Sequence, residues 1–271
     1  MRVGLLAHWP ASDPESSGVE SLAGAERVGF EALWLAPQTV ADDGVLLQAA
    51  ALAQRTDRIR LGIVGAPPPS LHPLRLAEDL AMLDLVSGGR LDWIPIADSA
   101  ARVAEVAETI EIVLRAWRGE AFAHAGRHHA FPELVCLPRP HQSPHPPVWL
   151  PSGSARPSAA EAPALGHWID GREDRSERAD ASAPRVLICT LAGDAAAEAS
   201  RRRVSWDGAT PRAGHAPISL RGDRTRGLAE LSRRLDEASP EWLIVASPPD
   251  APVDEAGLAE WFAFVAEAGA R

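Results

Sequence analysis

The sequence predicts one α/β domain over residues 1–271, folded as a (β/α)8 TIM barrel. Three observations support this fold class. Short apolar runs rich in β-branched residues alternate along the chain with longer segments of helical periodicity. One strand-helix-strand unit, at 58–96, is clear in all its parts. A length of 271 residues is normal for one barrel, so the length does not require two domains.

The central unit begins with an expected strand at 58–66, which ends where three prolines follow at 67–69. A helix is predicted from Pro73, with its leucines and alanines on one face, and two glycines at 88–89 end it. The next strand is expected at 90–96. Two strands joined by a helix of this length pair in parallel through a right-handed crossover.

The remaining elements alternate in the same way. Strands are expected at 3–8, 30–36, 148–152, 167–170, 185–191 and 242–247, and helices at 18–28, 42–54, 101–117, 194–204, 224–237 and 254–268, with one more beginning near 157. Residues 205–220 are expected to be irregular. Together with the two strands of the central unit, these segments provide the eight strands of a closed barrel.

A Pro-rich excursion at about 119–147 precedes the fifth strand. Proline lacks an amide hydrogen and fixes its φ angle, so the six prolines of this segment argue against regular structure, namely Pro132, Pro138, Pro140, Pro144, Pro146 and Pro147. We expect a lid or an excursion over one end of the barrel. The segment also holds His124, His128, His129, His141 and His145, but it lacks a nearby set of acidic residues, so no metal site is predicted.

The composition limits the partners and the chemistry. A net charge of -10 disfavours nucleic acid and anionic membranes as partners. The chain has no Lys and no Tyr, which excludes Schiff-base formation and tyrosine acid catalysis. Its two cysteines, Cys136 and Cys189, suit a reducing compartment. We see neither a leader nor an apolar run of membrane length, so we expect a cytoplasmic protein.

In a barrel of this type, chemistry takes place at the carboxyl ends of the strands. The residues expected there form an apolar rim with few ionisable groups, which favours a planar aromatic ligand. His8, at the end of the first strand, is the best-placed proton carrier, and an ordinary rim histidine is the alternative. Trp9, Trp93 and Trp168 either face a bound ring or fill the core.

Several blocks of sequence resemble the luciferase-like monooxygenases in order and spacing. They lie at 25–34, 52–62, 72–78, 83–92 and 111–149, the fourth containing Val-Ser-Gly-Gly-Arg-Leu-Asp at 86–92. Three linked blocks over about forty residues are far more specific than an isolated Ser-Gly-Gly-Arg. The resemblance covers most of the chain, more weakly after Gly171.

The resemblance implies that the ligand is reduced FMN or the deazaflavin F420, and that the reaction is oxygen activation or hydride transfer. The candidate catalytic residues are then His8 and Gln38, and the candidate cofactor-binding residues are Ala66, Pro67, Ser152, Ser154, Arg156 and Ser158. The serines lie in a turn before a helix, a natural phosphate site. Ala66-Pro67 stands where the family often has a cis peptide under the flavin ring, and a cis bond before proline would cost only about 0.5 to 1 kcal/mol.

Two departures from the family pattern count against catalysis. Gln38 stands where many members have a histidine, and an amide does not exchange a proton at neutral pH. The run at 93–98 replaces a glycine-rich turn that carries an arginine. It puts Asp98 where a cation would meet the cofactor phosphate, and a carboxylate repels that anion.

Two functions of different classes follow. The first is a flavin-dependent monooxygenase, or a related oxidoreductase, that uses reduced FMN with oxygen and a small organic substrate and is served by a flavin reductase. The second is a non-catalytic family member without a cofactor, acting as the silent partner of a paralogous subunit or as a scaffold. The resemblance implies a homodimer or a heterodimer. No motif identifies the substrate.

Overall fold

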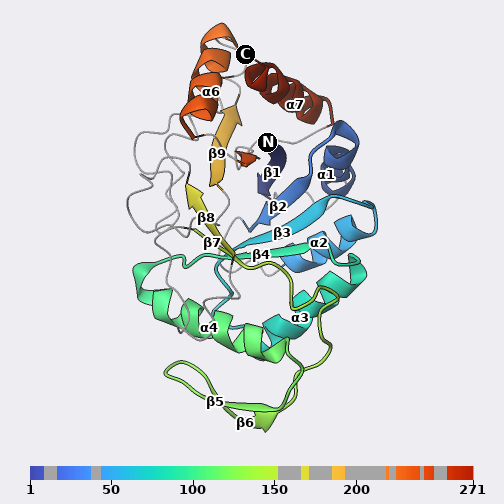
Figure 1. The fold of residues 1–271 in the computed structure, drawn as a ribbon. Coiled ribbons are helices and arrows are strands. Elements are labelled where there is room, and N and C mark those ends of the chain that lie inside the picture. The colour runs from blue at the N-terminus through green and yellow to red at the C-terminus, as the bar shows by residue number, and fades with distance from the viewer. Residues whose placement is uncertain are drawn as a thin grey trace.

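The computed structural model has the predicted α/β barrel fold (Figure 1). It describes residues 1–8, 17–37, 44–151, 166–170, 185–192, 218–219, 224–238, 241–246 and 255–270. Along the chain the elements are β1 (Arg2–His8), α1 (Ser17–Val28), β2 (Ala32–Ala36), α2 (Val45–Ala53), β3 (Arg60–Gly65), α3 (Pro73–Val86), β4 (Leu91–Pro95), η1 (Ala100–Arg102), α4 (Val103–Ala116), β5 (Phe122–Ala125), β6 (Ala130–Leu134), β7 (Trp149–Pro151), β8 (Gly166–Asp170), β9 (Arg185–Ala192), β10 (Ile218–Ser219), α6 (Arg224–Ala238), β11 (Trp242–Ala246) and α7 (Glu255–Gly269).

Among the described residues, eight parallel strands form the barrel. They follow one another in the order β4-β3-β2-β1-β11-β9-β8-β7, and β10 pairs with β9 beside this row. A parallel bridge between Trp93 of β4 and Val148, just before β7, joins the two ends of the row. The Trp93 amide donates to the Pro147 carbonyl over 2.9 Å at the same place. The row is thereby closed into a barrel.

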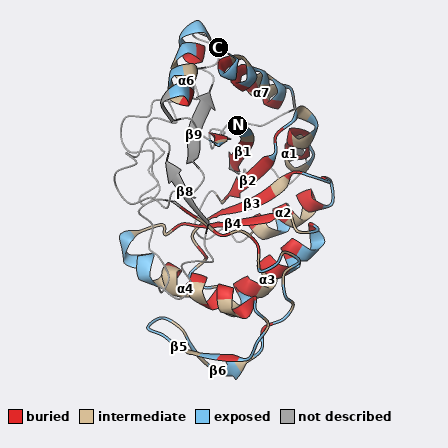
Figure 2. Ribbon diagram, viewed as in Figure 1, coloured by how far each residue is buried: buried red, intermediate tan, exposed pale blue. Residues whose placement is uncertain are grey.

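Two apolar layers stabilise the barrel, because side chains alternate between the two faces of each strand. The larger layer lies between the strands and the helices and includes Leu33 and Leu61, which are fully buried. The smaller layer includes Trp34 and Ile94. A Cβ at Gly62 would overlap the Trp34 indole, so this glycine makes room for the ring. Figure 2 shows α3 buried on one side and exposed on the other, whereas α4 is exposed at its amino-terminal end and buried or intermediate along the rest.

The segment 119–147 contains a β-hairpin, so the expectation that it lacks regular structure is wrong. β5 and β6 pair in antiparallel fashion, with Phe122 opposite Leu134 and Ala125 opposite Ala130. Pro132 is compatible with β6 because, in the part of the chain that the structure describes, this strand pairs with β5 alone and leaves one edge without ladder hydrogen bonds. In Figure 1 the hairpin lies beyond α4, outside the ring of strands.

Some predictions fall on residues that the structure does not describe. The helices expected near 157 and at 194–204 lie outside the described residues. Within the stretch expected to be irregular, Ile218–Ser219 forms the short strand β10. No helix in the described part of the chain is long and apolar enough to cross a membrane.

Candidate active site at the carboxyl ends of the strands

The described part of the rim is built mainly by the carboxyl ends of β1 to β4 and β11. Ala36, the last residue of β2, lies opposite His8, the last residue of β1. Ala36 and Ala246, which ends β11, both belong to the smaller apolar cluster. Small apolar side chains at the ends of these strands suit contact with a flat ring.

The loop between β3 and α3 is held on both sides of Ala66. Gly65 has a φ of +132°, a backbone conformation that favours glycine. The Ile96 amide donates to the Gly65 carbonyl over 3.1 Å. Nη2 of Arg102 donates to the carbonyl oxygen of Pro67 over 2.7 Å. The backbone at 65–67 is therefore fixed by two hydrogen bonds from residues that follow β4.

Arg102 lies at the centre of a compact ion network. Its Nη1 is 3.1 Å from Oδ2 of Asp98, and its Nη2 is 2.9 Å from Oε1 of Glu105. Its Nε donates to the second Glu105 oxygen over 3.1 Å. Only 14% of the Arg102 side chain is exposed. The bond to Glu105 is the main cause that raises the pKa of Arg102, burial opposes the rise, and Asp98 adds to it. The same bond lowers the pKa of Glu105.

The network contains one cation and two carboxylates. Its net charge is therefore negative, and its guanidinium is already bonded to both carboxylates and to a carbonyl. The prediction that Asp98 brings a negative charge to the end of β4 agrees with this arrangement. A cofactor phosphate would have to compete with Asp98 and Glu105 for Arg102, which makes this part of the rim unsuited to a phosphate.

Two of the predicted cofactor-binding residues, Ala66 and Pro67, lie in the loop just described. The expected cis bond between them is absent, since the cis peptide bonds among the described residues precede Pro138 and Pro144. The bond at Ala66-Pro67 is therefore trans. The path of this loop is set instead by the positive φ of Gly65 and by the two hydrogen bonds to its carbonyls.

The other predicted site residues are described in part or not at all. The backbone of His8 ends β1, as predicted. Gln38, Ser152, Ser154, Arg156 and Ser158 lie outside the described residues, so their roles stay predictions.

Among the tryptophans considered for ring contact, Trp93 is 2% exposed and packs edge-to-face on Trp117 in the layer between strands and helices. It fills the core. Trp9 lies outside the described residues, and of Trp168 the structure describes the strand alone.

Sequence reasoning missed Arg102. The signal was present, because Asp98, Arg102 and Glu105 have the i, i+4 and i, i+3 spacings at which charged side chains meet on a helix. The contact of Arg102 with Pro67 had no such signal, since 35 residues separate the two positions in the sequence.

The histidines of the excursion belong to a different arrangement. The carboxylate of Glu108 in α4 accepts hydrogen bonds from the amides of Arg127, His128 and His129, and it lies 3.1 Å from Nε2 of His124. This carboxylate holds the turn of the hairpin to the helix. Among the described residues, no group of three or more His, Cys, Asp or Glu side chains is placed to hold a metal ion.

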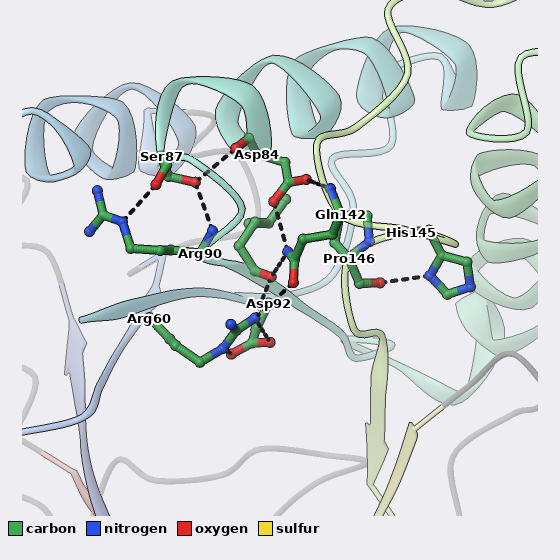
Figure 3. Close-up of polar contacts among 9 residues, drawn as sticks. Arg60, Asp84, Ser87, Arg90, Asp92, Gln142, His145 and Pro146 are labelled. Carbon is green, nitrogen blue, oxygen red and sulfur yellow. Dashed lines mark hydrogen bonds and ion pairs between the residues drawn. The ribbon is translucent and has the colours of Figure 1, made fainter. Parts of the chain in front are cut away.

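The opposite end of the barrel carries most of the motif at 86–92 (Figure 3). The Arg90 guanidinium donates to the carbonyls of Ala53, Ile59 and Ser87 and to the Thr56 hydroxyl. These groups lie before β3 and after α3, at the amino ends of the strands, where a barrel is stabilised and chemistry does not take place.

A second set of bonds joins the excursion to this end. Arg60, the first residue of β3, forms a pair of hydrogen bonds with Asp92 of β4 at 2.9 and 2.7 Å. The fully buried carboxylate of Asp84 accepts hydrogen bonds from the Gln142 amide at 2.8 Å and from its Nε2 at 2.7 Å. Gln142 also donates to the Leu91 carbonyl over 2.8 Å. These bonds fix the end of the excursion just before β7.

Comparisons with known proteins extend this description. The oxygenase component of a flavin-dependent trigonelline monooxygenase from Acinetobacter baylyi is 31% identical over 176 residues, which are 55% of this chain and 48% of that protein. The chain thus spans about half the length of this relative.

Solved structures agree with the fold along nearly the whole chain. The oxygenating constituent of 3,6-diketocamphane monooxygenase from Pseudomonas putida, solved with FMN, has a TM-score of 0.66 at 16% identity, covering 98% of each chain. The coenzyme F420 dependent tetrahydromethanopterin reductase from Methanopyrus kandleri has a TM-score of 0.67 at 14% identity, covering 98% of this chain and 99% of that one. At such identities the likeness shows the fold alone.

The model of one protein family, described as luciferase-like monooxygenase, matches residues 1–169. This span includes β1 to β7, both arginine networks and the resemblance blocks found in the sequence. The chain belongs to the luciferase-like monooxygenase family.

Proposed function

We propose that the chain is the oxygenase component of a flavin-dependent monooxygenase that uses reduced FMN supplied by a flavin reductase. The observation that carries this proposal is the family match over residues 1–169. The trigonelline relative, described as an oxygenase component, supports both the reaction class and the reductase partner. F420 is the alternative cofactor, because a structural neighbour depends on it. A cytoplasmic location and a homodimer or heterodimer stay predictions.

The described rim fits the ring of a flavin better than its phosphate. Ala36 and Ala246 end their strands with small apolar side chains, and the loop at 65–67 is held in one conformation. The trio of Asp98, Arg102 and Glu105 has a net negative charge, so it does not suit a phosphate. We therefore place the phosphate at the predicted serine turn with Ser152, Ser154 and Ser158, where Arg156 would supply the cation.

The chain's own residues would bind and shield the cofactor. Bound reduced flavin supplies the electrons for oxygen activation. Ala66 and Pro67 would contact the ring, and the apolar strand ends would exclude water from it. His8 would hold or move a proton at the rim, while Gln38 would donate and accept hydrogen bonds without exchanging a proton. The substrate class is a small organic molecule.

Titration of the purified protein with oxidised FMN, reduced FMN and F420 tests the proposal. We expect binding of FMN at micromolar concentration and oxygen consumption when reduced FMN is supplied. Replacing His8 with Gln should then lower turnover more than it lowers FMN affinity, since its proposed role is proton transfer. Absence of binding by a folded sample at about 100 micromolar would exclude a standalone oxygenase.

A non-catalytic role is the second candidate, and one observation favours it. Asp98 brings a carboxylate to the end of β4, and Arg102 is bonded to that carboxylate and to Glu105. A chain that has lost its cofactor would act as the silent partner of a paralogous subunit or as a scaffold. Failure to bind either cofactor, together with a stable complex with a paralogous chain, would favour this role.

A further inference from the structure

We propose that Arg102 is a positioning residue of the cofactor site. By holding the Pro67 carbonyl, it fixes the loop between β3 and α3 at the rim where the flavin would bind. The inference rests on the proposed function, because it assigns a role toward a cofactor whose binding is itself proposed. It concerns a residue that the family resemblance did not single out.

Capping of α4 does not explain an arginine at this place. Arg102 is the N-cap residue of α4, and its side chain makes no capping hydrogen bond there. Ser, Thr, Asp and Asn are the residues that stabilise this position. A cation near the first turn also opposes the helix dipole, whose positive end lies there. The side chain of Arg102 bonds instead to Asp98, to the Pro67 carbonyl and to Glu105 in the first turn of α4, and the first two of these partners lie outside the helix.

Only a guanidinium satisfies the three acceptors together. Its planar fork reaches Asp98 with Nη1, Glu105 with Nε and Nη2, and the Pro67 carbonyl with Nη2. Asp98 and Glu105 lie close to Arg102 in the sequence, whereas Pro67 is 35 residues away. Arg102 therefore connects the segment that follows β4 to the loop that follows β3.

The two carboxylates orient the arginine toward the loop. Asp98 and Glu105 lie on either side of Arg102 in the sequence, and both are mostly buried, with 22% and 23% of their side chains exposed. Held from two directions, the guanidinium loses little further freedom when it also bonds to Pro67. The Ile96 amide holds Gly65 in the same loop, so Ala66 lies between two fixed carbonyls. A binding loop that is rigid before the ligand arrives costs less to order on binding.

Three variants distinguish the loss of the bond between Arg102 and Pro67 from the change in net charge at the rim. Arg102→Gln removes the bond to Pro67 and leaves Asp98 and Glu105 without a cation. The double variant Arg102→Gln with Glu105→Gln also removes that bond, but it has the net charge of the wild type. Arg102→Lys keeps the charge, and its single ammonium does not reach all three acceptors.

Arg75→Gln is the matched control. Arg75 also pairs with two carboxylates, Glu78 and Asp79, but it does so on the surface of α3 with 64% of its side chain exposed. It makes no contact with the loop at 65–67 in the hydrogen bonds of the described residues. Its replacement removes the same charge without touching the proposed positioning contact.

The measurements are the dissociation constant for oxidised FMN and the visible circular dichroism of the bound flavin, which reports the surroundings of the ring. Thermal unfolding of each variant comes first, to establish that it is folded. We expect Arg102→Gln and the double variant to bind FMN about tenfold more weakly and to change the flavin spectrum. Arg102→Lys should give intermediate values, and Arg75→Gln should match the wild type.

Each possible outcome either supports the proposed role of Arg102 or overturns it. Recovery of wild-type binding and spectrum in the double variant would show a charge effect alone and would overturn the inference, as would an unchanged Arg102→Gln. If Arg102→Gln does not fold, Arg102→Lys decides by the same two measurements. A wild-type protein that binds neither FMN nor F420 refutes the proposed function, and the inference fails with it. A wild type that binds FMN, with unaffected variants at Arg102, refutes the inference alone.

Discussion

The two ends of β3 and β4 carry polar networks that differ in origin and in purpose. At the amino ends, Arg60 pairs with Asp92 and the buried Asp84 holds Gln142, so the bonds join strands, helix and excursion into one frame. At the carboxyl ends, Arg102 joins two acidic side chains to the carbonyl of Pro67. The amino-end network lies within the sequence blocks that resemble the family. The carboxyl-end network lies where the sequence departs from them.

The difference between the two networks shows which part of the barrel the resemblance blocks describe. Arg90 and Asp92 belong to the resemblance block at 83–92, and both make structural bonds at the amino ends of the strands. The block at 25–34 behaves alike, because Glu26 accepts hydrogen bonds from the amides of Arg58 and Ile59 at 2.8 and 2.7 Å, just before β3. These resemblance blocks therefore reflect the frame of the barrel, and the chemistry depends on the opposite end.

Replacing Asp84 with Ala should have the largest effect and should act on stability alone. Asp84 is fully buried and accepts two hydrogen bonds from Gln142, so its loss opens a cavity and removes the acceptor of the Gln142 backbone amide and one of the two acceptors of its Nε2. We expect the free energy of unfolding to fall by about 3 kcal/mol. Urea unfolding followed by tryptophan fluorescence measures this loss, and FMN titration of the folded variant should give the wild-type dissociation constant.

Asp79→Ala is the control for this experiment. Asp79 lies on the same helix and pairs with Arg75 at the surface, so its loss should change the free energy of unfolding by no more than about 0.5 kcal/mol. If Asp84→Ala lowered the free energy of FMN binding as much as it lowered the free energy of unfolding, our assignment of stability to the amino ends and of binding to the carboxyl ends of the strands would be wrong.

The fold was largely predictable from the sequence, because the apolar positions of the described helices and strands are the positions that are buried in the structure. α3 begins at Pro73 as expected, and β11 begins at Trp242 as expected. The proline content of 119–147 predicts no regular structure there, whereas the edge strand β6 accommodates Pro132, so the sequence does not reveal the hairpin of β5 and β6. Pairing across a turn held by Glu108 from another element leaves no periodic signal in the sequence.

The candidate site was less predictable. The position of Ala66 and Pro67 at the end of β3 followed from the order of the elements, since the strand ends at Gly65. The trans bond between them and the contact with Arg102 did not follow, because both depend on residues brought together by folding. The sequence places Asp98 just after β4, but its ion pair with Arg102, four residues further along, was not predicted.

Acid should weaken the amino-end frame through Glu26, with a smaller effect than the loss of Asp84. Burial tends to raise the pKa of Glu26, but hydrogen bonds from the amides of Ile59, Arg58 and Asp57 outweigh it, so the pKa is lowered from its ordinary value of 4.5. A carboxylate with a lowered pKa stabilises the fold above its unfolded pKa, and this contribution is lost as the pH falls through the folded value.

We therefore expect Glu26→Gln to lower the free energy of unfolding by about 1 kcal/mol at pH 7, and by clearly less at an acidic pH below the lowered folded pKa of Glu26, where the wild-type carboxyl is protonated. Urea unfolding of both proteins at the two pH values measures the difference. A difference that stays constant with pH would mean that the charge of Glu26 does not contribute.

The smallest expected effect belongs to the carboxyl ends and should appear in binding alone. Asp98→Asn removes one negative charge from the rim, while its side-chain oxygen still accepts the hydrogen bond from Arg102 and Arg102 keeps its bonds to Glu105 and Pro67. The phosphate of FMN would then meet less repulsion, and we expect FMN to bind roughly twofold more tightly at low salt, with stability unchanged. Riboflavin lacks the phosphate, so its affinity should not change. An equal gain for both ligands would place Asp98 near the ring, and no gain for either would mean that the phosphate lies beyond the range of this charge.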